Sequence, residues 1–407
     1  MKFVDVVFGE PLRAVAIAVL TFGSFVYLKC LNAGGAASIC GATAILLASV
    51  AVWTREKAVH CPASVKNAQR AASFDWGMHY MRGFAIVCIM LMHVQSKLGY
   101  HAFTQAFFSS STVYFLFISG YLCQYLALRK PIQDRIYYRK KILNVILPYV
   151  ICSLATAFFV WVTGSERGGI VRPQEVRFPE ILKMLIAGKA QVPYWYIPFV
   201  TGLFAISPWL TRLRFSSLAW LTGVFAAIAV VFPERRIPGS STFSVSAVLI
   251  HYSFFTVYYL IGFVYARRKD EIDRHLKSWV VPATLLGLVL GFGHLFPGLF
   301  GLPILETESR TSFQKLFFLV PVLLVAGSLK RRKIAILDLF AEYSFALFFL
   351  HYLFIEDFVA LQTRFRPALP AWILDPVLII AYLAFNLILA MCIKKAFGRW
   401  SRSVIGA

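Results

Sequence analysis

Long apolar stretches separated by short polar connections run through the whole chain. A stretch of about 17–25 apolar residues is long enough to cross the hydrocarbon core of a bilayer as a helix. Such stretches occur near residues 11–31, 36–54, 79–96, 110–128, 142–163, 193–210, 216–232, 244–266, 278–296, 314–329, 335–360 and 371–393. The pattern therefore predicts an all-α fold, a polytopic membrane helix bundle with about 12 transmembrane helices.

The composition agrees with a membrane protein and excludes a soluble one. Of the 407 residues, 59% are hydrophobic and only 15% are charged, whereas a soluble domain has about 25% charged residues. We expect residues 1–75 to form two extra N-terminal transmembrane helices and a basic cytoplasmic connector. Residues 76–395 are expected to form a ten-helix core, and residues 396–407 a cytoplasmic tail.

The net charge of +22 raises the question of a nucleic-acid partner. The basic residues lie in short clusters between the apolar stretches, and roughly two thirds of them fall in alternate connections, as the positive-inside rule predicts. We therefore expect membrane lipids and no nucleic acid as partners, with both termini in the cytoplasm and the chain in a bacterial inner (plasma) membrane. The seven Cys form no CxxC pair, so we expect no metal site.

The apolar stretch near 79–96 carries Arg82 at its start and His93 about three turns further on. Ionisable groups inside a membrane span are costly and commonly mark functional sites. A histidine titrates near neutral pH and can take a proton from an attacking hydroxyl, while an arginine can hold an anionic donor. Taken singly, Arg82 could be a flanking cation that reaches the surface, and His93 could be satisfied by a neighbouring helix.

Other polar and aromatic residues within the spans are candidates for orienting the histidine or stabilising an oxyanion. Each also has a simpler interpretation, such as helix packing, an interfacial aromatic belt or a helix that has already reached water. An acid from the connection 164–192, Glu175 or Glu180, is a further alternative. The candidates within the spans are Ser119, Tyr121, Trp195, His351 and Glu356.

These elements, in this order, resemble the acyltransferase-3 family of integral-membrane O-acyltransferases. The resemblance covers residues 76 to about 395. It is carried by Arg82-Gly83-x-Ala85-Ile86 with His93, Phe115-x-Phe117-Ile118-Ser119-Gly120-Tyr121, Lys140-Lys141 before Pro148-Tyr149, Tyr194-Trp195-Tyr196, Tyr259-Leu-Ile-Gly262, and Ser344 to His351.

The resemblance implies an enzyme that moves an acyl group, often acetyl, from cytoplasmic acyl-CoA to a hydroxyl of a glycan or lipid-linked saccharide at or across the membrane. Such polysaccharide modification belongs to the cell envelope. By this analogy His93 is the catalytic histidine, Arg82 helps to place the donor, and acyl-CoA (acetyl-CoA) is a co-substrate with no bound cofactor. The donor's phosphates would also meet a cytoplasmic cluster, Arg135, Arg139, Lys140 and Lys141.

The chain departs from the family pattern in two places that bear on the donor. Many members have an Arg-x-x-Arg pair in the cytoplasmic loop, where this chain has Arg135-x-x-x-Arg139 followed by Lys140-Lys141. Members often carry an acidic residue three positions before the arginine, where this chain has His79. The competing function is a twelve-span transporter or flippase of a polar or saccharide substrate, with His93 as a proton relay. The lack of a visible repeat between the two halves of the sequence weighs against a transporter.

Overall fold

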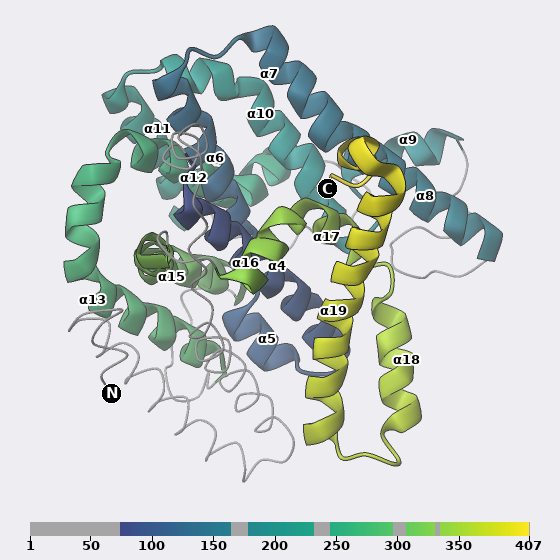
Figure 1. The fold of residues 1–407 in the computed structure, drawn as a ribbon. Coiled ribbons are helices and arrows are strands. Elements are labelled where there is room, and N and C mark those ends of the chain that lie inside the picture. Colours follow the sequence, from purple (N-terminus) through teal and green to yellow (C-terminus); the bar gives the residue numbers. More distant parts are fainter. Residues whose placement is uncertain (1–73, 164–177, 232–244, 296–306, 330–333, 407) are drawn as a thin grey trace, which may run out of the picture.

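The computed structural model describes residues 74–163, 178–231, 245–295, 307–329 and 334–406 (Figure 1). Every regular element in these ranges is a helix, which confirms the predicted all-helical fold. The predicted spans 11–31 and 36–54 and most of the basic connector lie outside the described residues. Figure 1 shows α4 in the middle of the bundle, with α18 and α19 side by side on one flank and α13 on another.

The helices vary widely in length. They are α4 (Trp76–Lys97), α5 (His101–Phe107), α6 (Thr112–Arg129), α7 (Asp134–Lys141), the π-helical turn η1 (Ile142–Ile146), α8 (Leu147–Thr163), α9 (Phe178–Ala187), the 3₁₀ turn η3 (Val192–Trp195), α10 (Tyr196–Arg212), α11 (Phe215–Val231), α12 (Val245–Arg267), α13 (Lys269–Leu295), α15 (Thr307–Leu329), α16 (Ala335–Glu342), α17 (Ser344–Leu350), α18 (Ile355–Phe365), α19 (Ala371–Phe397), the 3₁₀ turn η4 (Gly398–Trp400) and α20 (Ser401–Val404).

Five segments within the described ranges are long and apolar enough to cross a membrane. A sixth span is possible if the bent pair α17 and α18 crosses as one unit. The count of about 12 is therefore not confirmed, because several predicted spans are shorter or broken helices. The five are Trp76–Lys97, Asp134–Val162, Lys269–Gly293, Thr311–Leu329 and Ala371–Phe397.

Among these five segments, α4 is the most deeply enclosed by protein. In its most apolar stretch, 72% of the residues are buried, against 33–44% in the other four. Asp75 caps the helix by accepting a hydrogen bond from Met78 N at 3.1 Å. Gly83 lets α16 approach closely, since a Cβ there would lie 2.5 Å from Leu337 O. The central position of α4 means that its side chains face other helices rather than lipid.

A second close crossing joins α6 and α12 through a pair of glycines. A Cβ at Gly120 would overlap the carbonyl oxygen of Tyr259, and one at Gly262 would overlap that of Phe117. Small residues of this kind allow helix backbones to touch inside a membrane. The crossing fixes α6 beside α12 and so helps to position α6 against α4.

The predicted continuous span 335–360 is wrong, because this segment is divided into α16, α17 and α18, with a bend of 66° between α17 and α18. The bend after α17 has a local cause. The His351 ring bonds to the carbonyl oxygens of Leu347 and Phe348, at 2.9 and 3.0 Å, in the last turn of α17. A side chain that takes these acceptors competes with the continuing backbone ladder.

The short helix α5 was not predicted from the sequence. Two contacts show how α6, which follows α5, lies against α4. Tyr121 OH donates to Asp75 at 2.6 Å, and the Tyr114 ring lies 6.0 Å from that of Phe84. α6 therefore runs antiparallel to α4 and begins about halfway along it. The chain leaves the Lys97 end of α4 and returns through α5 to that depth before α6 starts.

Candidate active site

Arg82 and His93 lie on the same face of α4. At 3.6 residues per turn, a separation of eleven residues corresponds to three turns plus about 20°, and to about 16 Å along the axis. Between them on this face, Ile86 and Ile89 are only 0% and 1% exposed. The two candidate groups are therefore aligned along one closely packed side of the central helix, with Arg82 near the Asp75 end and His93 near the Lys97 end.

The His93 ring lies against two side chains from the segment that follows α17. Its centroid is 5.3 Å from that of His351 and 5.1 Å from that of Tyr352, which meets it edge-on. Within the described part of the chain, the ring nitrogens of His93 form no hydrogen bond, and the residue is only partly buried. His93 is thus held by ring packing, with its nitrogens free for a substrate.

His351 is fully buried and has a defined tautomer. Its Nδ1 lies 2.9 and 3.0 Å from two carbonyl oxygens, which can only accept, so Nδ1 carries the proton. Its Nε2 is buried and has no partner among the described residues. Tyr382 OH donates to the His351 carbonyl at 2.6 Å and fixes the backbone. An unoccupied acceptor nitrogen therefore lies beside the His93 ring.

Glu356 does not contact His93, as an acid that orients this histidine would have to, but pairs with Lys97 instead. Its Oε1 lies 2.7 Å from Lys97 Nζ, and both side chains are about two-fifths exposed. Lys97 follows His93 by one helical turn. The Lys97–Glu356 pair therefore belongs to the rim above His93, and the structure places His351 rather than Glu356 against the His93 ring.

The remaining candidates from α6 and η3 lie elsewhere in the bundle. Tyr121 donates to Asp75 at the start of α4, about five turns from His93, and Ser119, two residues earlier on α6, bonds to the Tyr196 side chain. Trp195 packs against the rings of Tyr252 and Phe255, at 5.9 and 4.9 Å. The structure brings Tyr121 to the Asp75 end of α4, Ser119 to Tyr196 of α10, and Trp195 to an aromatic cluster with α12.

The Arg82 guanidinium is held through His79. Arg82 Nη2 lies 3.4 Å from His79 Nδ1, and His79 Nε2 lies 2.8 Å from Asp338 Oδ1 on α16. Arg82 Nε is buried without a partner among the described residues. Sequence reasoning assigned no role to Asp338; a carboxylate inside the apolar segment 335–360 was the one available signal.

The model of a protein family described as an acyltransferase domain, acyltransferase-3, matches residues 75–395. The chain belongs to this family. It is therefore an acyltransferase and, with its long apolar helices, an integral membrane protein. The resemblance found in the sequence is confirmed over almost the same residues. No curated protein and no solved structure matches the chain.

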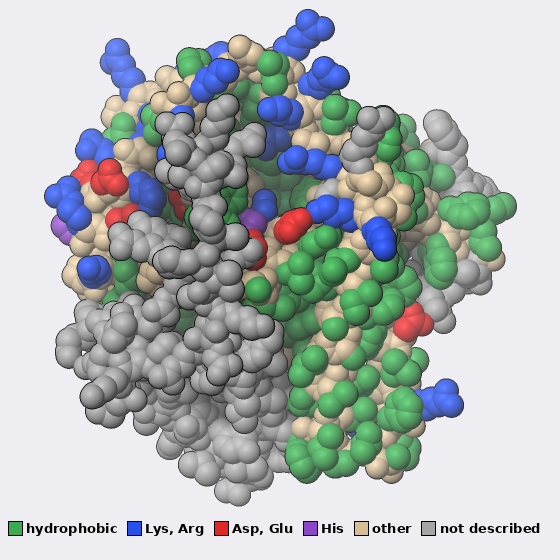
Figure 2. Space-filling model, viewed as in Figure 1, with side chains coloured by type: hydrophobic (Ala, Val, Ile, Leu, Met, Phe, Trp, Pro, Cys, Tyr) green, Lys and Arg blue, Asp and Glu red, His purple; other side chains and the backbone are tan. Residues whose placement is uncertain are grey.

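The basic cluster of this acyltransferase divides into exposed and inward-facing members. Arg135, Arg139 and Lys140 are exposed on α7, and basic side chains gather over this end of the molecule in Figure 2. Lys141 instead turns inward, with its Nζ 3.6 Å from the centre of the Phe204 ring. Three of the four candidate donor-binding cations therefore remain available to a ligand at the surface.

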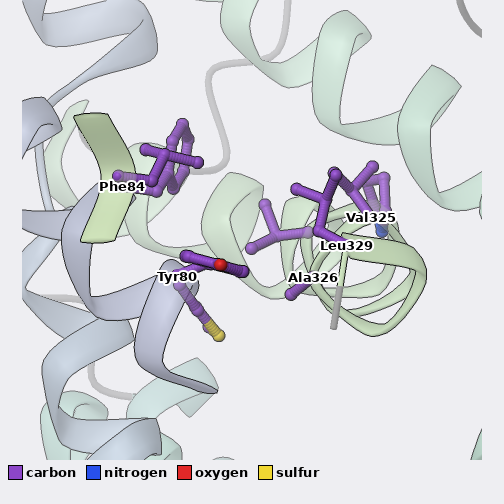
Figure 3. A pocket seen from close by; sticks show the side chains of 9 residues that line it. Tyr80, Phe84, Val325, Ala326 and Leu329 are labelled. Carbon is purple, nitrogen blue, oxygen red and sulfur yellow. The ribbon is translucent and has the colours of Figure 1, made fainter. Parts of the chain in front are cut away.

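An apolar hollow of about 240 Å³ lies between α4, α15 and α16. Figure 3 shows Tyr80 and Phe84 on one side of it and Val325, Ala326 and Leu329 on the other. At 100° per residue, Tyr80 and Phe84 project from the side of α4 opposite Arg82. This hollow is thus separate from the Arg82–His93 face. The described residues also contain no group of three His, Cys, Asp or Glu placed to bind a metal.

Proposed function

We propose that this acyltransferase transfers an acyl group, most simply acetyl, from cytoplasmic acyl-CoA to a hydroxyl of a glycan or lipid-linked saccharide. The observation that supports this best is the shared face of α4, where a cation and an unbonded imidazole are about 16 Å apart. A donor of this class has its phosphates and its thioester at opposite ends of a long, thin arm. A ligand with separated charged and reactive ends suits two separated protein groups.

In this proposal the donor's anionic end binds Arg82 and the exposed cations of α7. Guanidinium groups suit phosphate oxygens because several N–H donors lie in one plane. The pantetheine arm then follows the face of α4 toward His93. Ile86 and Ile89 fill that face in the structure, so we expect them to move when the donor binds.

The reaction needs one proton to move twice. His93 takes the proton from the acceptor hydroxyl as its oxygen bonds to the thioester carbonyl carbon. When the carbon–sulfur bond breaks, the leaving thiolate receives that proton from the His93 imidazolium. The products are an ester and free coenzyme A thiol, and His93 returns to its neutral form.

We assign the orienting role to His351. A base that becomes positively charged during the reaction is stabilised by an acceptor beside it, the part played by a carboxylate in many hydrolases. The Nε2 of His351 is an acceptor with no partner among the described residues. The Lys97–Glu356 rim, which is open to solvent, is the side from which we expect the saccharide to approach.

Thiol release by the purified protein tests this function. Wild-type protein in detergent or nanodiscs should release coenzyme A thiol from acetyl-CoA when a glycan acceptor is present, and mass spectrometry should show the acetylated glycan. His93→Ala should lose about 10²–10⁴-fold in this rate, the usual contribution of a general base. Insertion and thermal unfolding should remain as in the wild type. Turnover at the wild-type rate in His93→Ala would refute the assignment.

A further inference from the structure

A chain of three polar side chains connects α16 to α4 at the Arg82 end. Asp338 Oδ1 lies 2.8 Å from His79 Nε2, and His79 Nδ1 lies 3.4 Å from Arg82 Nη2. A guanidinium nitrogen can only donate, so His79 Nδ1 is the acceptor and the ring proton resides on Nε2, which donates to Asp338. His79 is therefore neutral in this arrangement and touches the carboxylate on one side and the arginine on the other.

The interposed histidine has a clear electrostatic consequence. An arginine paired directly with a carboxylate is largely neutralised and less able to hold another anion. Here the carboxylate fixes the His79 ring, the ring fixes one edge of the guanidinium, and no carboxylate among the described residues pairs with Arg82. Arg402 on α20 lies near enough to act on Arg82, and its charge is also positive. Arg82 is thus oriented while its charge stays available.

Close helix packing makes the link possible. Gly83 lies next to Arg82 on α4, and the Leu337 carbonyl lies where a side chain at position 83 would begin. This approach brings Asp338, in the first turn of α16, within hydrogen-bond distance of His79. The side chains of His79 and Asp338 are only 10% and 28% exposed, which protects their bond from water.

We propose that His79 and Asp338 are positioning residues that orient Arg82 toward the anionic end of the acyl donor. The proposal rests on the proposed function, since it takes acyl-CoA as the donor. It adds two residues that act on donor binding without touching the reacting atoms. Their removal should weaken the hold on the donor's phosphates and leave the chemistry at His93, about three turns away, unchanged.

Two donors test the proposal, one with and one without the 3′-phosphoadenosine diphosphate that carries all the phosphates of coenzyme A. With acetyl-CoA, Asp338→Asn should raise KM about tenfold and change kcat by less than about twofold. With S-acetyl-pantetheine, which has the same thioester and no phosphate, the KM of Asp338→Asn should equal that of the wild type. Asp338→Glu should restore most of the affinity for acetyl-CoA. In an Arg82→Gln background, Asp338→Asn should add nothing further.

Glu342→Gln is the matched control. Glu342 lies one turn after Asp338 on α16 and pairs with Lys394 at 2.5 Å, so this variant removes the same charge without touching the His79 bond. Its KM for acetyl-CoA should stay within about twofold of the wild-type value. Equal KM changes with both donors, or none with acetyl-CoA, would overturn the positioning role.

Binding of coenzyme A separates this proposal from the proposed function. Titration calorimetry on the purified wild-type protein and on Asp338→Asn measures affinity for the phosphates without turnover. If the wild type binds coenzyme A and Asp338→Asn binds it about tenfold more weakly, yet neither releases thiol from acetyl-CoA, the proposed function fails and the positioning role stands. If the wild type turns over and Asp338→Asn binds coenzyme A equally well, the positioning role alone fails.

Discussion

Replacing His351 by Phe removes the acceptor beside His93 while keeping a ring of similar volume. The structure sets the size of two separate effects. Loss of the Nδ1 hydrogen bonds to the carbonyls of Leu347 and Phe348 should cost about 0.5–1.5 kcal/mol of folding free energy. Loss of a hydrogen bond to the charged His93 imidazolium should cost about 1.5–3 kcal/mol in the reaction. At about 1.4 kcal/mol per tenfold in rate, kcat should fall about 10- to 150-fold.

The assay is the steady-state rate of thiol release from acetyl-CoA, measured beside thermal unfolding of the same preparation. His351→Gln, which retains a donor and an acceptor, should lose less activity than His351→Phe. Glu356→Gln is the control, because its exposed pair with Lys97 is worth at most about 1 kcal/mol and should affect kcat less than about twofold. Wild-type kcat in His351→Phe, or a larger loss in Glu356→Gln, would refute the orienting role of His351.

Three further predictions concern packing, buried charge and surface charge. Gly262→Ala should destabilise the protein by about 1–3 kcal/mol in thermal unfolding, because the added methyl overlaps the α6 backbone. Gly223→Ala is the control and should not destabilise it, because nothing lies within 4 Å of a Cβ there. Equal effects of the two variants would contradict this account of the crossing. Lys315 is 1% exposed and donates to Phe107 O at 2.8 Å. Lys315→Met should unfold at a higher temperature than Lys315→Ala, because both lose this hydrogen bond but only the alanine also leaves a cavity. The reverse order would show that packing of the Lys315 hydrocarbon stem does not contribute to stability. Neutralising the three exposed cations of α7 to Gln should raise the KM for acetyl-CoA two- to fivefold at low salt and reduce its salt dependence; an unchanged salt dependence would place the donor elsewhere.

The sequence predicted the central helix closely because local chemistry defines it. The apolar run near 79–96 becomes α4, Trp76–Lys97, extended at its start because Asp75 supplies a cap. Hydropathy could not show that 335–360 is broken, since a bend caused by the His351 ring leaves the composition of the segment unchanged. The return of the chain through α5 was also invisible, because a seven-residue helix is far shorter than a span.

Only the part of the candidate site that lies on a single helix, α4, could be predicted from the sequence. The spacing of Arg82 and His93 fixes both their separation and their common face, so it follows from the sequence alone. Contacts between helices do not. The carboxylate of Glu356, five residues after His351, pairs with Lys97, and Asp338 reaches His79 across 259 positions of sequence. Contacts between residues so far apart in the sequence depend on how α16, α17 and α18 pack beside α4.

The broken segment that begins at α16 serves both ends of the face on α4. Asp338 reaches the Arg82 end through His79, and His351, thirteen residues later, lies against His93. Thirteen helical residues would span about 20 Å, comparable with the 16 Å between Arg82 and His93, so α16 and α17 run alongside α4 in the same direction. The helix α4 fixes the distance between Arg82 and His93. The parallel helices α16 and α17 provide the residues that contact each of them, Asp338 through His79 at Arg82 and His351 at His93.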